Sequence, residues 1–145
     1  MLSQTAEYAL RAVVHLAMAR GALTTQDIAS STKVPPGYLA KVLQSLARAG
    51  ILSSQRGLRG GFRMAREATE VTVLEVINAV DPIRRITTCP LGLAAHGTRL
   101  CALHHRLDQA TAKVESTFGN TTIAEMLDDD TQAAALCEFP RPVLE

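Results

Sequence analysis

The sequence predicts a mainly α-helical fold: a winged helix-turn-helix with a two-stranded wing and a long C-terminal dimerisation helix. Apolar residues make up 47% of the 145 residues and aromatic residues only 3%, which favours packed helices over a β-sandwich or barrel. Apolar positions also recur at helical spacing in several separate stretches. A glycine-rich hairpin follows the third stretch, which is where a wing belongs.

Two helices open the chain. Residues 5–20 predict the first, because apolar residues repeat every three or four positions and Gly21 follows as a typical stop. A short second helix begins near Thr24 or Thr25, whose hydroxyl can cap the first turn, and ends near Ser31.

The third helix and the wing come next. Proline suits the first turn of a helix, so residues 36–49 predict a helix that starts at the second proline of a Pro-Pro pair. Residues 51–54 and 62–64 predict two short strands, and the turn between them is marked by three glycines, Gly57, Gly60 and Gly61.

The C-terminal half changes character at residue 83. Before it, Thr72 and Glu75 form a capping box that opens a short apolar helix. Residues 83–98 show no periodicity and predict a loop, after which residues 99–118 predict a long helix. Its apolar stripe has the spacing of a seam against another helix and consists of Leu100, Leu103, Leu107, Val114 and Phe118. A short helix at 121–127 follows.

We therefore expect four regions. Residues 1–82 form the helix-turn-helix domain, residues 83–98 a cofactor-binding loop, residues 99–128 the dimerisation helix with the short helix, and residues 129–145 a tail. The sequence has no apolar stretch of membrane-spanning length and no leader-like start, so we expect a soluble cytoplasmic protein.

Charge is segregated along the chain. The segment from Lys33 to Arg66 holds seven of the 15 Lys and Arg residues and no Asp or Glu, which leaves eight cations against all 14 acids elsewhere. A phosphate-binding face requires such segregation, although a solvated surface can also show it.

Residue types within this segment suit DNA. The N-terminal outer face of the third helix offers small residues for close approach and polar ones for base edges or phosphates, and the wing places two guanidinium groups on a flexible tip. The candidate DNA-binding residues are Lys33, Gly37, Tyr38, Lys41, Gln44, Arg56 and Arg59. The plainer interpretation is that the glycines merely close a hairpin and the arginines are solvated.

Three segments resemble a known family. Ala6-Glu7-Tyr8-Ala9-Leu10, the stretch from Tyr38 to Leu52, and above all Arg56-Gly57-Leu58-Arg59-Gly60-Gly61-Phe62 are similar to the IscR/NsrR-type (Rrf-two) bacterial transcription regulators. The resemblance spans about residues 2–127. It implies a homodimer crossed at the long helix, with each subunit contacting half of a near-palindromic DNA operator. It also implies an iron-sulfur cluster, since many relatives carry one in the loop before that helix.

Cysteine and histidine spacing suggests a metal site. His104 and His105 lie three and four positions after Cys101, so on a helix both would share its face, and Cys89 would arrive from the loop. Three cysteines in an intracellular chain argue against a disulfide framework. Cys137, isolated near the tail, is interpreted as a buried or free thiol.

The resemblance refines this ligand set. Cluster-binding relatives have three cysteines at five-residue intervals and sometimes a histidine; Cys89, Cys101 and His104 match, but Ala95 replaces the middle cysteine. Some relatives complete the shell with a carboxylate from the first helix of the partner subunit, and Glu7 occupies that position. Two further positions remain open: His96 as a substitute for the missing cysteine, and Arg11 where one relative has a histidine.

Several alternatives stay open. Glu7 and Arg11 are four residues apart, which an ordinary helical ion pair explains, and either histidine could be a surface residue. The cysteine pair could form a thiol-disulfide switch or bind zinc. A protein-interaction module would not explain the acid-free segment, and no oxyanion site or substrate pocket favours an enzyme. We expect a regulator that senses redox or nitrosative stress or iron-sulfur status through a cluster, most simply a [2Fe-2S] cluster.

Overall fold

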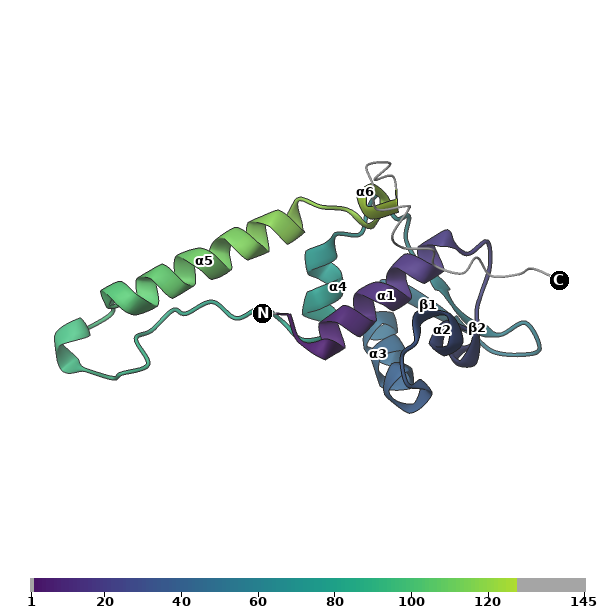
Figure 1. The fold of residues 1–145 in the computed structure, drawn as a ribbon, viewed down its shortest axis with the longest axis horizontal. Helices are drawn as coiled ribbons and strands as arrows, with labels where there is room; N and C mark the ends of the chain where they lie inside the picture. Colours follow the sequence, from purple (N-terminus) through teal and green to yellow (C-terminus); the bar gives the residue numbers. More distant parts are fainter. Residues whose placement is uncertain (1, 128–145) are drawn as a thin grey trace.

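A computed structural model of the chain describes residues 2–127, and its fold is the predicted one (Figure 1). Helices and a two-stranded sheet follow one another in the expected order. The elements are α1 Gln4–Met18, α2 Thr25–Thr32, α3 Pro36–Arg48, β1 Leu52–Gln55, β2 Gly61–Met64, α4 Val73–Val80, the 3-10 turn η1 Ala94–His96, α5 Ala102–Gly119 and α6 Ile123–Leu127. The mainly α-helical winged helix-turn-helix is therefore confirmed.

Helix α1 is the centre of the core. It packs against α2, α3, α4 and α6, and Ala6, Ala9 and Ala12 on its buried face are at most 1% exposed. These small residues let neighbouring helices approach closely, while leucines from α3 fill the space beyond them. Burying one leucine side chain fully contributes about 1.5–3 kcal/mol, so this cluster stabilises the helix-turn-helix body.

Side-chain caps start the helices where the sequence predicts them. Thr24 and Asp27 form a reciprocal capping box at α2, and Thr72 and Glu75 form the same box at α4. Each box satisfies backbone N–H groups that a helix start leaves without partners.

Helix α1 ends earlier than the sequence pattern suggests, at Met18 rather than near residue 20. Ala19 is extended, and the chain beyond it joins the wing, where Leu23 and Phe62 exchange two backbone hydrogen bonds of 2.9 and 2.8 Å. A cross-strand pairing therefore ends the helix before Gly21 is reached.

The wing is an antiparallel pair in which Leu52 faces Met64 and Gln55 faces Gly61. Two of its glycines are required by space. A Cβ on Gly60 would lie 2.6 Å from the Gln55 carbonyl oxygen, and one on Gly61 would lie 2.2 Å from that of Leu23, with φ at +143°. No other residue fits either position without moving the backbone.

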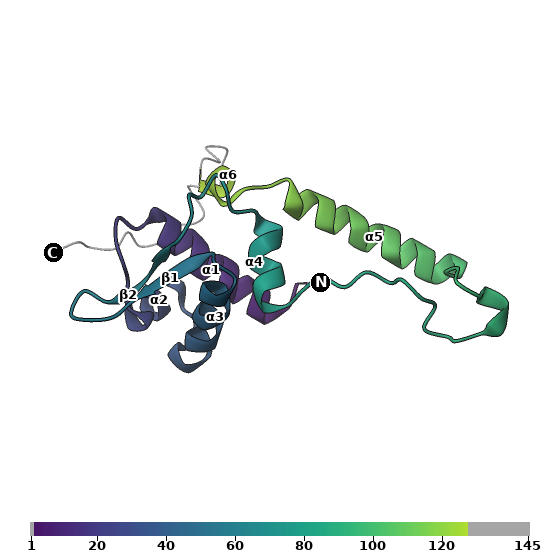
Figure 2. The same ribbon diagram turned by 180° about the vertical axis from the view of Figure 1, so that it is seen from behind.

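Helix α5 extends away from the body, and the loop before it runs back alongside (Figures 1 and 2). Helix α5 contacts α4 near the C-terminal end of α5, where Phe118 packs on the core. None of its residues is buried. Within residues 2–127, no helix is both long and apolar enough to cross a bilayer. The predicted tail and Cys137 lie outside the described residues.

Candidate metal centre and nucleic-acid interface

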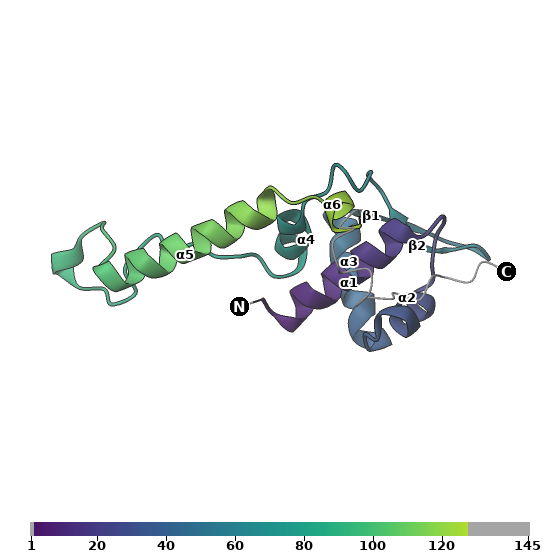
Figure 3. The ribbon, with the colours of Figure 1, turned by 45° about the horizontal axis from the view of Figure 1, so that its top comes forward.

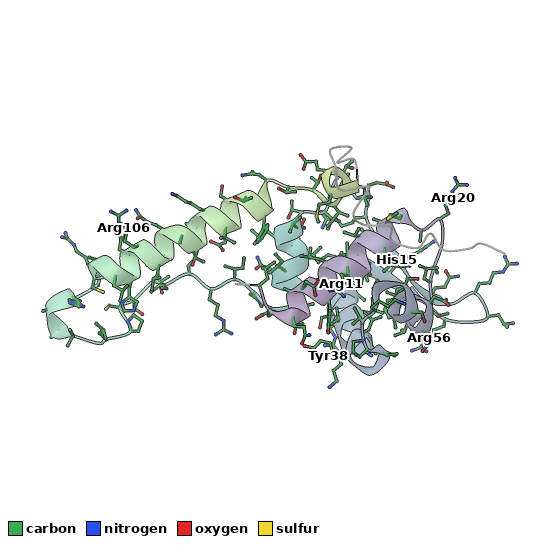
Figure 4. All side chains as sticks on the ribbon, viewed as in Figure 1. Arg11, His15, Arg20, Tyr38, Arg56 and Arg106 are labelled. Atoms are coloured by element: carbon green, nitrogen blue, oxygen red, sulfur yellow. The ribbon has the colours of Figure 1, made fainter. Side chains whose placement is uncertain are left out.

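All seven candidate DNA-binding residues are exposed. Lys33 follows α2 in a left-handed conformation with φ at 58°, four residues lie on α3, and the two arginines lie on the turn between β1 and β2. Figure 4 labels one residue from each of the latter groups: Tyr38 at the start of α3 and Arg56 at the wing. The helix-turn-helix and the wing thus present basic side chains to solvent.

The structure adds contacts for Tyr38 and for the acid-free segment. The Tyr38 hydroxyl hydrogen-bonds the Thr5 hydroxyl, and its ring meets that of Tyr8 edge to face at 5.7 Å. Tyr38 therefore also ties α3 to α1. The acid-free segment is partly neutralised in space, because Arg66 forms a 2.8 Å ion pair with Glu75 of α4. That pair lowers the pKa of the Glu75 carboxyl and leaves Arg66 occupied.

Three side chains of types that can bind a metal converge at the start of α5. One ligand atom each from Cys89, Cys101 and His104 lie within 4.8 Å of one another, and all three residues are half-buried. The His104 Nδ1 atom lies 3.0 Å from the Cys101 sulfur and 3.6 Å from the Cys89 sulfur. Two thiols and an imidazole are donors that suit an iron-sulfur cluster or zinc, so these residues fit either group.

The two other histidine candidates lie differently. His96, predicted as a weaker candidate, has its Nδ1 atom 3.2 Å from the Cys89 sulfur, although it is outside the group of side chains that converge within 4.8 Å. His105 is exposed and is not among the converging side chains. The reason is that α5 begins at Ala102 rather than residue 99, so Cys101 is the extended residue before the helix and its side chain meets the third following residue only.

Glu7 lies elsewhere in the same chain. Its carboxylate forms a 2.6 Å ion pair with Arg11, whose guanidinium also donates to the Thr32 carbonyl oxygen. Helix α1 belongs to the body, whereas the loop with the cysteines lies at the far end of α5 (Figures 1 and 3). Within one chain Glu7 is therefore paired with Arg11 and away from the converging thiols.

The environment of Cys89 favours its thiolate. A backbone N–H of Leu91 and the His96 side chain hydrogen-bond its sulfur and lower the pKa of the thiol to about 6. Because a metal ligand must be a thiolate, this arrangement prepares Cys89 for binding or for oxidation at neutral pH.

An ion pair that no sequence motif indicates holds the loop. The Arg85 guanidinium makes two 2.6 Å hydrogen bonds to the Asp108 carboxylate, which also accepts from the Ile86 N–H at 3.0 Å. These bonds hold the pKa of Asp108 down at about 2. The pairing spans 23 positions, so no spacing rule reveals it. It fixes the start of the loop against α5, four residues before Cys89.

Comparisons with known proteins agree with this architecture. A family model described as Rrf2, iron-dependent transcriptional regulator, matches residues 2–129. A protein of Aquifex aeolicus (strain VF5), whose name places it among HTH-type transcriptional regulators, is 30% identical over 132 residues, covering 88% of this chain and 92% of the relative. The HTH-type transcriptional regulator IscR of Vibrio atlanticus (strain LGP32) is 27% identical over 131 residues, covering 89% of this chain and 76% of the relative.

Solved structures share the fold. IscR of T. potens has a TM-score of 0.74 at 22% identity and covers 92% of this chain and 90% of its own. CymR of B. subtilis, titled a global cysteine regulator, has a TM-score of 0.73 at 20% identity and covers 90% of this chain and 98% of its own. These proteins are regulators, not enzymes, as the sequence analysis expects for this chain. With the family model matching most of its length, the chain belongs to the Rrf2 family of transcriptional regulators.

Proposed function

We propose that the protein is a homodimeric regulator that binds a near-palindromic DNA operator in the bacterial cytoplasm. Helix α3 enters the major groove with Lys41 and Gln44 toward base edges or phosphates, and Arg56 and Arg59 of the wing contact phosphates or the minor groove. The exposure of these side chains on one helix-turn-helix and its wing supports the proposal.

Dimerisation through α5 follows from its uncovered apolar side chains. Leu103 and Leu107 are 62% and 48% exposed. A groove of about 470 Å³ runs between α1, α4 and α5, and Leu107, Val114 and Ile77 are among its lining residues. A second copy of α5 has the matching apolar stripe, so a two-fold pair would cover both stripes at once.

The sensor is an iron-sulfur cluster, in its simplest form [2Fe-2S]. The observation that carries this is the convergence of Cys89, Cys101 and His104 within 4.8 Å, in a chain whose family model is described as iron-dependent. A bound cluster would supply one-electron redox chemistry. The thiolates and the imidazole hold it, and Glu7 of the partner subunit is the candidate further ligand. Occupancy changes operator affinity only if the two states contact DNA differently.

A metal-free thiol switch is the second candidate, and zinc occupancy the third. The lowered pKa of Cys89 favours the switch, because its thiolate reacts readily with oxidants and Cys101 is close enough to resolve the product. The mixed sulfur and nitrogen donors favour zinc.

Anaerobic purification tests the cluster. Visible absorption with iron and sulfide analysis should show a cluster in the wild-type protein. Cys89→Ala and Cys101→Ala should abolish it. His104→Ala or Glu7→Ala should make the cluster labile or shift its reduction potential. Cys137→Ala is the matched control and should change neither property. Operator affinity should differ between loaded and unloaded wild-type protein.

Two results would count against the cluster proposal. Colourless, iron-free protein that still binds operator would favour the thiol switch or zinc. A cluster that survives Cys101→Ala but is lost in Cys137→Ala would show that the ligands are wrongly assigned.

A further inference from the structure

We propose that His96 is a ligand of the metal site, so that one chain supplies two thiolates and two imidazoles: Cys89, His96, Cys101 and His104. The inference deepens the proposed function and rests on it for the location of the site. It replaces the missing middle cysteine by a residue one position further along.

Three sulfur–nitrogen distances are close to those of a closed shell, and His96 completes the shell by moving from Cys89 toward the group of Cys89, Cys101 and His104, whose ligand atoms lie within 4.8 Å of one another. Metal–sulfur and metal–nitrogen bonds of about 2.3 and 2.0–2.1 Å at tetrahedral angles place neighbouring sulfur and nitrogen ligands about 3.6 Å apart. The His96 Nδ1 atom lies 3.2 Å from the Cys89 sulfur, and the His104 Nδ1 atom lies 3.0 and 3.6 Å from the two sulfurs. All three contacts are near the edge of such a tetrahedron.

The loop is folded so that this side chain faces inward. Every residue from Leu91 to Arg99 is exposed except His96, which is half-buried. The 3-10 turn Ala94–His96 carries it, and Gly97 at φ 50° reverses the chain directly afterwards. Backbone bonds from the Gly92 N–H to the Cys89 oxygen and from the Arg99 N–H to the His96 oxygen close the loop on both sides.

Both ends of this loop are anchored to α5. Asp108 holds Arg85 and the Ile86 N–H before Cys89, and Cys101 is the residue that precedes the helix. Because both ends of the loop are held, the His96 imidazole loses little conformational freedom when it binds a metal. It already lies beside the Cys89 sulfur.

The ligand class follows from the donors. Two thiolates and two imidazoles saturate one tetrahedral divalent ion of the zinc class. The same four donors would also serve as the terminal ligands of a two-iron cluster with mixed ligation. In that case the ligands on opposite irons would have to move apart. His96 is a ligand in both cases.

Anaerobic titration with Co(II) tests the assignment on the full chain. Wild-type protein should bind one Co(II) per chain, with thiolate-to-cobalt charge transfer and the intense visible bands of tetrahedral cobalt. His96→Ala should weaken binding by at least about tenfold and alter the visible bands, because water replaces an imidazole. His96→Cys should restore affinity with stronger charge transfer. The control is His105→Ala, one residue from His104, which should behave as wild type.

The outcomes separate the two proposals. Unchanged Co(II) affinity and spectrum in His96→Ala, or a failure of His96→Cys to restore binding, would overturn the role of His96. Operator affinity that ignores metal or cluster loading in every variant would instead defeat the proposed function, while leaving the ligand set of the site intact. In chemical reconstitution, sulfide uptake that depends on His96 would identify the cluster form.

Discussion

At the residue scale, Lys41 and Arg59 test the DNA-binding face most directly. Both are exposed, on α3 and on the wing. Within residues 2–127, neither side chain forms a hydrogen bond or an ion pair. Lys41→Ala and Arg59→Ala should therefore weaken operator binding with no loss of folding stability, by about 1–3 kcal/mol where a base contact is lost. Titration of labelled operator at fixed salt measures this.

Arg106→Ala is the matched control for that experiment. Arg106 projects from α5 on the side away from the loop (Figure 4), so its removal should leave operator affinity unchanged. Full affinity in both Lys41→Ala and Arg59→Ala would show that the DNA-binding face is placed wrongly.

His15 predicts how stability depends on pH. The side chain is 1% exposed, its Nε2 atom has no hydrogen-bond partner within the described residues, and burial lowers its pKa. An unfolded chain binds the proton near its ordinary pKa of about 6.5, whereas the folded chain binds it only at lower pH. Stability should therefore be full above about pH 6.5 and fall as the pH drops from there toward the folded-state pKa.

Urea unfolding at pH 7.5 and 5.5 measures the effect. His15→Leu should remove part of the pH dependence, and His105→Gln, at an exposed position, should retain all of it. An identical pH dependence in wild type and His15→Leu would contradict the assignment to His15.

The candidate metal site shows which of its residues sequence spacing can predict. Spacing singles out Cys89, Cys101 and His104, which the structure brings together, because local separations of three residues survive at a helix start. It does not separate His104 from His105, since that depends on whether Cys101 is inside or before the helix. The Arg85–Asp108 pair has no local pattern at all, because it forms only when the loop folds back along α5.

At the element scale, the wing depends on two glycines. Gly60→Ala or Gly61→Ala should lower the stability of the wing and weaken operator binding, since each new Cβ would press against backbone at 2.6 or 2.2 Å. Gly21→Ala is the control, because nothing lies within 4 Å of that position. Hydrogen exchange of β1 and β2 amides reports the change; unaltered protection in Gly61→Ala would argue against the required close approach.

Helix boundaries were predictable where a local signal sets them. Capping boxes fix the starts of α2 and α4 from residues within one turn. The end of α1 was not predictable in this way, because Leu23 pairs with Phe62, which is 39 positions away. The stretch after Met18 therefore looks helical in sequence, whereas in the fold Ala19 is extended and Arg20 and Gly21 form a bend.

At the scale of the whole molecule, the uncovered stripe of α5 predicts a homodimer. Leu107→Glu should give a monomer at micromolar concentration, because a charge would enter the apolar seam, and the chain should stay folded since Leu107 is 48% exposed already. Arg106→Glu, at the adjacent position, should remain dimeric. Light scattering decides; a monomeric wild-type protein at that concentration would contradict the prediction.

The length of α5 has a mechanical consequence. Its 18 residues make a rod about 27 Å long, with the thiols at one end and the body with α3 and the wing at the other (Figure 1). A tilt of only about 5° displaces the far end of such a rod by roughly 2 Å, comparable with the ~3.4 Å rise between base pairs. In the proposed dimer the helix would act as a lever, so that a slight rearrangement around the sulfurs would change the spacing of the two DNA half-sites.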